Sequence, residues 1–412
     1  MRVLVAGAGI GGLTTALALN QRGIDVQVFE SVREIAPLGV GINLLPHATA
    51  ELEALGVLDP IDAAGVRTAE LCYFNRHGQL IWREPRGLDA GYPVPQISVH
   101  RGALQLALLA VVKQRLGKDV VRTGWHLESF ATDESGTVRA EFSERPSGAR
   151  REERADLLVG ADGIHSAVRR ALRPGEGPPR WNGNVLWRAT SRAAPFLSGR
   201  SMIMAGSRVR KFVAYPISAP AADGLCVINW IAELHRDAGE TPAREDWNRR
   251  GALEDFLPAF ADWRFDWLDV AGLIRSAEAI YEFPMVDRDP IPGWTSGRAT
   301  LLGDAAHPMY PIGSNGASQA ILDARALADA LAGEHDVPSG VDGALARYEA
   351  ARRPATAKIV LSNREHGPEC VLDLAEERAP DGFTRVEDVF AQGELEEIAV
   401  RYKRVAGFAR AS

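Results

Sequence analysis

Apolar residues recur along the chain in two patterns, short continuous runs and longer runs with helical spacing. The chain opens with a short apolar run over 1–6, and a helix-like segment over 13–19 follows a glycine-rich stretch. A second apolar run over 26–29 ends at Glu30. A strand, a turn, a helix and a second strand in this order predict a βαβ unit.

Further runs of both kinds extend this prediction along the chain. Buried strands are expected at 156–161 and 299–304, and helices at 46–55, 103–116, 316–331 and 341–363. Alternating apolar and polar residues predict an antiparallel sheet, with strands at 185–190, 201–205, 212–217 and 225–231 and a hairpin at 71–74 and 80–82. The polar segment 144–154 is expected to be a turn region, and the charged tail after Gly367 to be partly helical.

The glycines after the first strand have the spacing of a dinucleotide-binding turn. Gly7 permits the tight turn, Gly9 lets the backbone approach a pyrophosphate, and Gly11 and Gly12 allow helix and strand to pack closely. The pyrophosphate would lie on the free N–H groups at the start of the helix. Glu30 is placed to bind the hydroxyls of an adenosine ribose, which favours FAD or NAD over NADP. A plain βαβ turn is the alternative.

Two aspartates and a small-residue loop extend this pattern. Asp162 and Asp304 each follow a buried strand, and strand ends of this kind border the ligand crevice of α/β sheets. The loop 311–316 opens the helix predicted at 316–331, so its N–H groups can face a negatively charged ring edge such as that of a reduced flavin.

Composition excludes several classes of function. The net charge of −7 gives no electrostatic footprint for nucleic acid. Cys72, Cys226 and Cys370 are too far apart for a metal site or a redox pair. No apolar segment is long enough to span a membrane, and the first run is too short and glycine-broken for a signal peptide. A cytoplasmic enzyme without a metal is therefore expected.

At these residues the chain resembles the single-component FAD-dependent aromatic hydroxylases of the para-hydroxybenzoate hydroxylase type. Three motifs carry the resemblance: 7–12 with Glu30, 162–169 and 303–308. Within this family the chain resembles the phenazine-pathway hydroxylases that act on 5-methylphenazine-1-carboxylate. The stretches that carry this narrower likeness are 39–43, 100–102, 246–248, 310–311, 315–323 and 351–354.

The resemblance implies a fold and a domain division. The fold is α/β, with a Rossmann-like FAD-binding domain of the glutathione-reductase type, an inserted antiparallel-sheet substrate domain and C-terminal helices. The FAD-binding domain is expected to be discontinuous, over 1–70, 96–176 and 282–363. The substrate domain is expected at 71–95 and 177–281, and a C-terminal segment at 364–412.

The resemblance also implies a cofactor shell and a reaction. FAD is bound noncovalently, and its expected contacts are Gly7, Gly9, Gly11, Gly12, Glu30, Gly41, Arg101, Asp162, Asp304, Gly313, Ser314, Asn315 and Gly316. NADH or NADPH is the transient reductant. Molecular oxygen adds to flavin C4a as a hydroperoxide, which hydroxylates an aromatic or N-heteroaromatic substrate, with or without loss of carbon dioxide. A phenazine-type or hydroxyaromatic carboxylate is favoured.

Candidate substrate contacts lie mainly on the predicted antiparallel sheet. Flat aromatic faces can stack on a ring, and a guanidinium can pair with a carboxylate. The candidates are Trp187, Arg188, Met204, Tyr215, Trp230 and, in the flavin loop, Pro311. Of these, Arg188, Tyr215 and Pro311 are expected to position the substrate for catalysis. His307 and His47 are interpreted as capping or solvated histidines rather than bases.

Three other functions fit a flavin-binding chain. The first, a flavin-dependent halogenase, is disfavoured because the first lysine is Lys113 and because Trp263 and Trp267 have the wrong spacing. The other two, a reductase or dehydrogenase without oxygen insertion and a nonenzymatic flavin-binding protein, stay open from the sequence. The sequence leaves the oligomeric state open as well.

Overall fold

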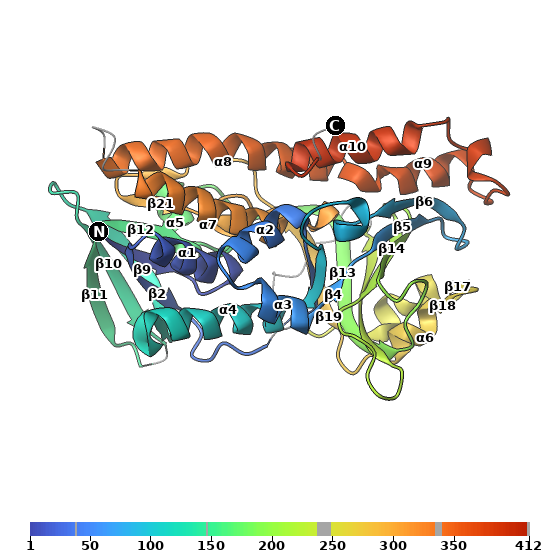
Figure 1. The fold of residues 1–412 in the computed structure, drawn as a ribbon, viewed down its shortest axis with the longest axis horizontal. Coiled ribbons are helices and arrows are strands. Elements are labelled where there is room, and N and C mark those ends of the chain that lie inside the picture. The colour runs from blue at the N-terminus through green and yellow to red at the C-terminus, as the bar shows by residue number, and fades with distance from the viewer. Residues whose placement is uncertain (38, 146, 237–248, 334–339, 410–412) are drawn as a thin grey trace.

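The computed structural model describes residues 1–37, 39–145, 147–236, 249–333 and 340–409. The segment 246–248, which carries part of the resemblance, lies outside the described residues. Two main sheets divide the described chain, one in each half of the molecule as Figure 1 presents it.

The first main sheet has six strands in the order β20-β21-β12-β1-β2-β8. All its neighbours pair in parallel except β20 and β21. The strands are β1 (Arg2–Ala6), β2 (Asp25–Glu30), β8 (Val121–Thr123), β12 (Leu157–Gly160), β20 (Thr295–Ser296) and β21 (Ala299–Leu301). The carboxyl ends of β1, β2, β12 and β21 therefore meet at one edge, which is where the glycine turn, Glu30, Asp162 and Asp304 lie.

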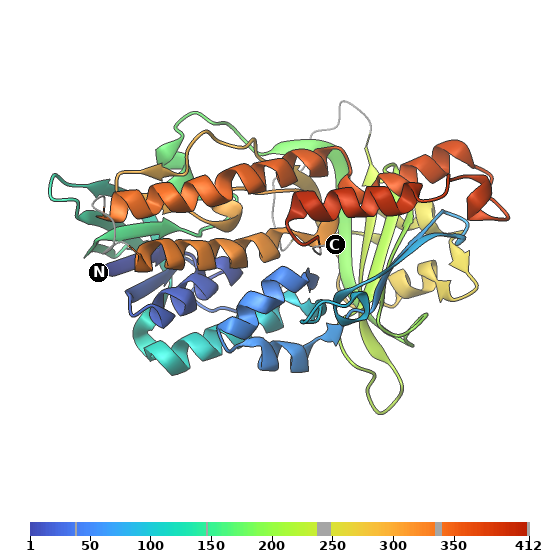
Figure 2. The same cartoon turned by 45° about the horizontal axis from the view of Figure 1, so that its top comes forward.

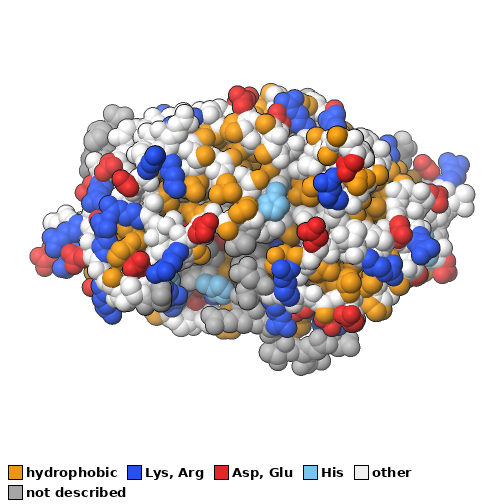
Figure 3. Space-filling model, turned by 90° about the horizontal axis from the view of Figure 1, so that it is seen from below, with side chains coloured by type: hydrophobic (Ala, Val, Ile, Leu, Met, Phe, Trp, Pro, Cys, Tyr) orange, Lys and Arg blue, Asp and Glu red, His pale blue; other side chains and the backbone are white. Residues whose placement is uncertain are grey.

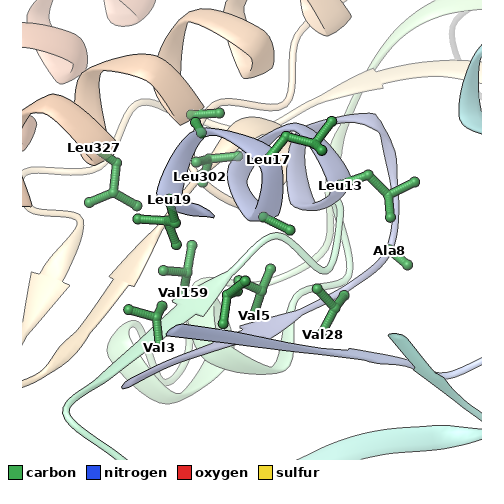
Figure 4. Packing of buried hydrophobic residues seen from close by; sticks show 14 of the residues in the cluster. Val3, Val5, Ala8, Leu13, Leu17, Leu19, Val28, Val159, Leu302 and Leu327 are labelled. Atoms are coloured by element: carbon green, nitrogen blue, oxygen red, sulfur yellow. The ribbon is translucent and has the colours of Figure 1, made fainter. Parts of the chain in front are cut away.

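Helices pack on this sheet through apolar faces. Figure 4 shows Leu13, Leu17 and Leu19 of α1 (Ile10–Gln21) above Val3, Val5, Val28 and Val159 of the strands. The same core contains residues of α2 (Pro46–Ala54), α3 (Leu58–Ala64), α4 (Arg101–Leu116), α5 (Ala167–Leu172), α7 (Gly316–Ala332) and α8 (Gly340–Arg364). Burial of so many aliphatic side chains is the main force that holds this half together.

The second main sheet has seven strands in the order β19-β13-β16-β15-β14-β5-β6. Only β14 and β5 pair in parallel. The strands are β5 (Glu70–Phe74), β6 (Leu80–Pro85), β13 (Arg180–Ala193), β14 (Ser201–Gly206), β15 (Arg210–Pro216), β16 (Cys226–His235) and β19 (Tyr281–Asp287). One face packs on an aromatic-rich core that includes α6 (Val270–Arg275).

The other paired strands form three smaller sheets. The first contains β9 (Trp125–Thr132), β10 (Val138–Glu144) and β11 (Arg150–Ala155), and the second contains β3 (Gly41–Leu44), β4 (Val66–Arg67) and β7 (Ile97–His100). The third contains β17 (Arg264–Phe265) and β18 (Leu268–Asp269). The prediction of a turn region over 144–154 was wrong at β11. This strand is at an edge and exposes most of its charged side chains, so it has no apolar alternation to reveal it.

The chain after Gly367 packs against both halves. Helices α9 (Cys370–Arg378) and α10 (Glu394–Ala406) lie along the same side of the molecule as α8, as Figure 2 shows. Val371, Leu372 and Ile398 share a core with sheet residues Tyr73 and Met204. The segment is thus part of the fold and covers one end of the seven-stranded sheet.

The structure confirms the predicted fold class, an α/β protein with a Rossmann-like parallel sheet, antiparallel sheets and C-terminal helices. Figure 3 shows acidic and basic side chains interspersed with apolar ones over the face seen from below. Among the described helices, none combines the length and apolar composition that a bilayer span requires.

Candidate active site

The glycine turn between β1 and α1 is shaped by close backbone contacts. Gly7 has a φ of +102°, and a Cβ atom there would lie 2.3 Å from the carbonyl oxygen of Ala161. A Cβ atom on Gly12 would lie 2.0 Å from the Gly7 carbonyl oxygen. These two positions accept only glycine without a shift of the backbone.

Gly9 has a different environment. A Cβ atom there would meet nothing within 4 Å, so this side of the turn faces open space. Gly9 is also the N-cap of α1, and no side chain caps the N–H groups of that helix. Free N–H groups at the positive end of a helix of 12 residues, next to open space, fit the pyrophosphate of a dinucleotide.

Glu30, at the end of β2, is oriented by the backbone around it. Its Oε2 accepts a hydrogen bond from the Ala8 N–H at 2.8 Å, and its Oε1 accepts one from the Val32 N–H at 3.0 Å. The carboxylate is thereby fixed beside the glycine turn, where the ribose contact is predicted.

Asp304, at the carboxyl edge of the parallel sheet, and Arg101, at the start of α4, lie close enough to interact electrostatically. The Asp304 side chain is solvent-accessible, yet it is surrounded by enough protein that burial raises its pKa, with His307 and Arg101 opposing the shift. Burial lowers the pKa of Arg101, and Asp304 opposes that shift. A Cβ atom on Gly316 would lie 4.0 Å from Asp304 Oδ1, so this carboxylate borders the start of α7.

Asp162 is engaged within its own turn. Its Oδ1 accepts from the Ser166 hydroxyl at 2.5 Å, and its Oδ2 accepts from the Ala167 N–H at 2.7 Å. The two bonds hold the start of α5. Asp162 therefore has less hydrogen-bonding capacity left for a ligand than Asp304.

The two histidines differ in their match to the expected capping or solvated positions. His307 is buried, and its Nε2 lies 2.5 Å from Asp323 Oδ2. Burial would raise the pKa of Asp323, but His307 and Arg352 outweigh it and lower that pKa to about 2. His47 stacks on Phe408 with ring centroids 5.4 Å apart, and burial, aided by Arg352, lowers its pKa to about 4. The expectation was wrong for His307, because packing against α7 removes its ring from water, whereas His47 is half-buried against the C-terminal segment.

The loop before α7 is held by two residues that the sequence did not single out. The Asn363 Nδ2 group donates to the carbonyl oxygens of Tyr310 and Ile312, both at 3.1 Å. Gly313 has a φ of +66°, and a Cβ atom there would lie 2.0 Å from the Tyr402 hydroxyl. No motif marks Asn363 or Tyr402, because their role depends on how α8 and α10 pack.

Ser314, Asn315 and Gly316 continue this loop into α7. Asn315 Nδ2 donates to the Tyr402 oxygen at 2.8 Å, and its burial is complete. Ser314 has a φ of 57°. Pro311, at the start of the loop, is exposed. The loop is thus held on the side that faces Asn363 and Tyr402, and it is accessible to solvent at Pro311.

One face of the seven-stranded sheet approaches the cofactor region. The Gly41 N–H donates to Asn229 Oδ1 at 2.6 Å, and a Cβ atom on Gly41 would lie 2.8 Å from the Tyr215 ring. Burial and, to a smaller extent, the charge of Arg101 lower the pKa of Arg188 to about 10. Two arginines that repel each other across this junction favour an anion between them. Asn229 was not expected from the sequence.

Trp187 and Trp230 lie on the other face of that sheet. Trp187 stacks on Phe256 with ring centroids 5.0 Å apart, and Trp230 Nε1 donates to the Ser191 hydroxyl at 2.9 Å. Successive side chains of a strand point to opposite faces, so Trp187 and Arg188 cannot share one. The structure does not bring these tryptophans together with Tyr215.

A narrow cavity lies between the sheet face and the loop. Met202 and Met204 of β14 line it from one side, and Gly313 and Ser314 from another. Across the described ranges, no group of three or more His, Cys, Asp and Glu side chains is arranged to hold a metal ion. The donor set at the carboxyl edge of the parallel sheet, made of backbone N–H groups, carboxylates and Arg101, fits FAD.

The comparisons with known proteins agree with this site. Residues 1–362 match the family described as FAD binding domain. The chain is 50% identical over 367 residues to the phenazine 1,6-dicarboxylic acid hydroxylase PhzS of Lysobacter antibioticus. This match covers 88% of this chain and 89% of that protein. It is 32% identical to the 3-hydroxybenzoate 6-hydroxylase of Polaromonas naphthalenivorans (strain CJ2), over 89% of this chain and 87% of that protein.

A solved structure supports the fold. The crystal structure of Klebsiella pneumoniae HpxO complexed with FAD and uric acid superposes with a TM-score of 0.76 at 24% identity, and the match covers 99% of this chain and 96% of that one. The family match and the relatives show that this chain belongs to the FAD binding domain family and is a flavoprotein monooxygenase.

Proposed function

We propose that the protein uses FAD, NADH or NADPH and molecular oxygen to hydroxylate an aromatic carboxylate, with a phenazine carboxylate as the favoured substrate. The observation that carries this proposal is the 50% identity to the phenazine 1,6-dicarboxylic acid hydroxylase over most of both chains. The relative that acts on 3-hydroxybenzoate supports the wider class of ring acids.

The two sheets take different parts in this proposal. The parallel-sheet half, over 1–70, 96–176 and 282–363, would hold FAD, and the antiparallel half, over 71–95 and 177–281, would hold the ring. Gly7, Gly9 and the start of α1 would bind the pyrophosphate and Glu30 the ribose. Asp304, Arg101 and the loop up to Gly316 would hold the flavin end. FAD supplies the oxygen-transfer chemistry when bound.

The sheet face would orient the substrate beside the flavin loop. Arg188 can hold a carboxylate in two parallel hydrogen bonds, which fixes the direction of the ring as well as its position. Tyr215 is buried, and this burial raises the pKa of its hydroxyl, so the group stays protonated and can donate. Met204 would pack on the ring, and Pro311 would form part of the opposite wall. Trp187 and Trp230 are not included.

Water exclusion is the other task of the protein. The sheet face beside the loop is lined by buried methionine and tyrosine side chains, and the C-terminal segment covers part of it. A ring seated there would displace water from the reacting carbon. If the attacked carbon bears the carboxylate, the bond to the carboxylate carbon breaks, carbon dioxide leaves, and the ring regains the electron pair. We place the enzyme in the cytoplasm, where NADH and NADPH are supplied.

The test is ligand-dependent reduction of the purified holoenzyme. Phenazine-1-carboxylate, phenazine-1,6-dicarboxylate and 3-hydroxybenzoate would each be mixed with enzyme and NADH or NADPH, first without and then with oxygen. We expect at least one acid to accelerate flavin reduction about tenfold or more, because substrate can gate access of the reductant to the flavin. Reoxidation by the acid itself in the absence of oxygen would instead indicate a reductase.

A further inference from the structure

A buried charge cluster lies in the wall of the cavity between the sheet face and the loop. Arg86 Nη2 is 2.8 Å from Glu84 Oε2, and Lys403 of α10 contacts Glu84 Oε1. The side chains of Glu84 and Arg86 are 5% and 10% exposed, respectively. Charges removed from water to this degree are costly unless they are balanced and hydrogen-bonded.

At the cavity wall, cations outnumber carboxylates. Arg86 and Lys403 are both cationic, and Glu84 is the one carboxylate among the charged residues that line this cavity in the described part of the chain. The neighbouring buried carboxylate Glu369 shares the Lys211 ammonium with Glu233, at 2.5 and 2.9 Å. The formal charges of the two groups together therefore balance, while the extra cation lies at the cavity wall.

Apart from Glu84 Oε1, which has the Lys403 ion contact, three polar atoms in the same cavity also lack hydrogen-bond partners among the described residues. They are the Nε of Arg86, the hydroxyl of Tyr73 and the Oε1 of Gln96. Arg86 is 8% exposed, and Tyr73 and Gln96 are each 2% exposed. Buried polar groups in native proteins are nearly always paired, so a cluster of three needs an explanation. Arg86 and Tyr73 offer N–H and O–H donors, the groups that a carboxylate accepts from.

The strand register places this polar end next to the proposed ring site. Tyr73 pairs with Met204 across β5 and β14, and Leu71 pairs with both Met202 and Glu84. Directly opposite residues have Cβ atoms about 5 Å apart. The flavin-loop residues Gly313 and Ser314 line the same cavity. A ring on the methionines can therefore reach the donors with one substituent.

We propose that the cavity end formed by Arg86, Tyr73 and Lys403 is a carboxylate subsite for the aromatic substrate. The carboxylate would accept hydrogen bonds from Arg86 Nε and the Tyr73 hydroxyl, and its negative charge would face the two cations of the cavity wall. Gln96 would accept from a hydroxyl or N–H of the same ring. Arg188 would hold the second acid group of a dicarboxylate. This inference rests on the proposed function, because it assigns a second contact for the same substrate class.

The experiment measures ligand affinity of the oxidised holoenzyme by flavin absorbance titration. The probes are phenazine, phenazine-1-carboxylate and phenazine-1,6-dicarboxylate, and the variants are Tyr73→Phe, Arg86→Met and Arg86→Lys. The matched control is Arg83→Met, since Arg83 lies on β6, three residues before Arg86, but is 54% exposed. Thermal midpoints of each ligand-free holoenzyme are recorded as well.

Tyr73→Phe removes a hydroxyl that has no hydrogen-bond partner among the described residues, so its thermal midpoint should not fall. We expect it to weaken binding of at least one acid about threefold to tenfold, and Arg86→Met about tenfold or more, as loss of neutral and charged hydrogen bonds implies. Arg86→Lys should recover part of the affinity. Binding of unsubstituted phenazine, and all binding by Arg83→Met, should stay within about twofold of the wild type.

Unchanged affinity of Tyr73→Phe for both acids would overturn the subsite, and that variant decides the question if Arg86→Met does not fold. Equal weakening of phenazine and the acids would also overturn it, because packing rather than charge recognition would then be responsible. If the wild type binds and hydroxylates an acid while these variants match it, the proposed function stands and this inference fails. If the wild type binds neither acid, both are contradicted.

Discussion

The cofactor end and the substrate end of this molecule are built in different ways. The glycine turn and Glu30 lie within the first thirty residues, and close backbone contacts shape the turn, since a Cβ atom on Gly7 or Gly12 would lie 2.3 or 2.0 Å from a backbone oxygen. The proposed substrate end combines side chains of Tyr73, Arg86, Met204 and Lys403, which line one cavity and belong to four separate segments. A site made by backbone leaves a motif in the sequence, whereas a site made by distant side chains becomes visible only after folding.

Two substitutions at the glycine turn separate the effect of packing on stability from the effect on FAD binding. Gly12→Ala should lower the free energy of unfolding by about 3 kcal/mol or more, because its Cβ would lie 2.0 Å from a backbone oxygen. Gly9→Ala is the control, since its Cβ would meet no protein atom within 4 Å. Denaturant unfolding of the apoprotein and FAD titration would be measured for both. Equal stability of Gly12→Ala and wild type would contradict this packing.

The pH dependence of the free energy of unfolding tests whether His47 is held neutral in the folded protein. Its folded pKa of about 4 lies below the value of 6.5 in the unfolded chain, so the unfolded state gains the proton first as pH falls. The stability that comes from a neutral His47 is complete above pH 6.5 and is lost progressively toward pH 4. Between pH 7 and 4.5 the wild type should lose about 2 kcal/mol more than His47→Gln. Parallel pH profiles would show that His47 is not held neutral.

At the cofactor end, the two strand-end aspartates should differ. Asp304→Ala should weaken FAD binding about tenfold to a hundredfold, the loss of a charge-assisted hydrogen bond of about 1.5–3 kcal/mol. Asp162→Ala should weaken it less, because both Asp162 oxygens already bond the start of α5. Titration of the apoproteins with FAD gives the two affinities. An Asp304→Ala affinity equal to that of the wild type would exclude this contact.

At the substrate end, neighbouring residues on opposite sheet faces should act differently. Arg188→Met should raise KM for a phenazine carboxylate about tenfold and increase the hydrogen peroxide formed per NADH or NADPH, since a misplaced ring is attacked less often. Trp187→Phe should change the thermal midpoint but not this ratio, because Trp187 packs on Phe256. If Arg188→Met leaves KM and the peroxide ratio unchanged, Arg188 has a structural role.

Much of the fold was predictable because the apolar periodicity of β13 to β16 and of α7 is strong. The positions of Glu30 and Asp304 at the carboxyl edge also follow from the sequence, since parallel strands end there. Asn229, Asn363 and Tyr402 were not predictable, because each is a single polar residue whose partner lies far away in the chain. Strand periodicity alone shows that Trp187 and Arg188 point apart, but it does not show which of them faces the cofactor.

The proposed function requires one atom of molecular oxygen to enter the substrate ring, and the mass of the product formed under labelled oxygen measures this directly. Holoenzyme, NADH or NADPH and phenazine-1-carboxylate or phenazine-1,6-dicarboxylate would react under ¹⁸O₂, with ¹⁶O₂ as the control. We expect a ring product that carries one ¹⁸O atom per molecule. Consumption of NADH or NADPH that yields hydrogen peroxide, or a reduced ligand without any label, would contradict it.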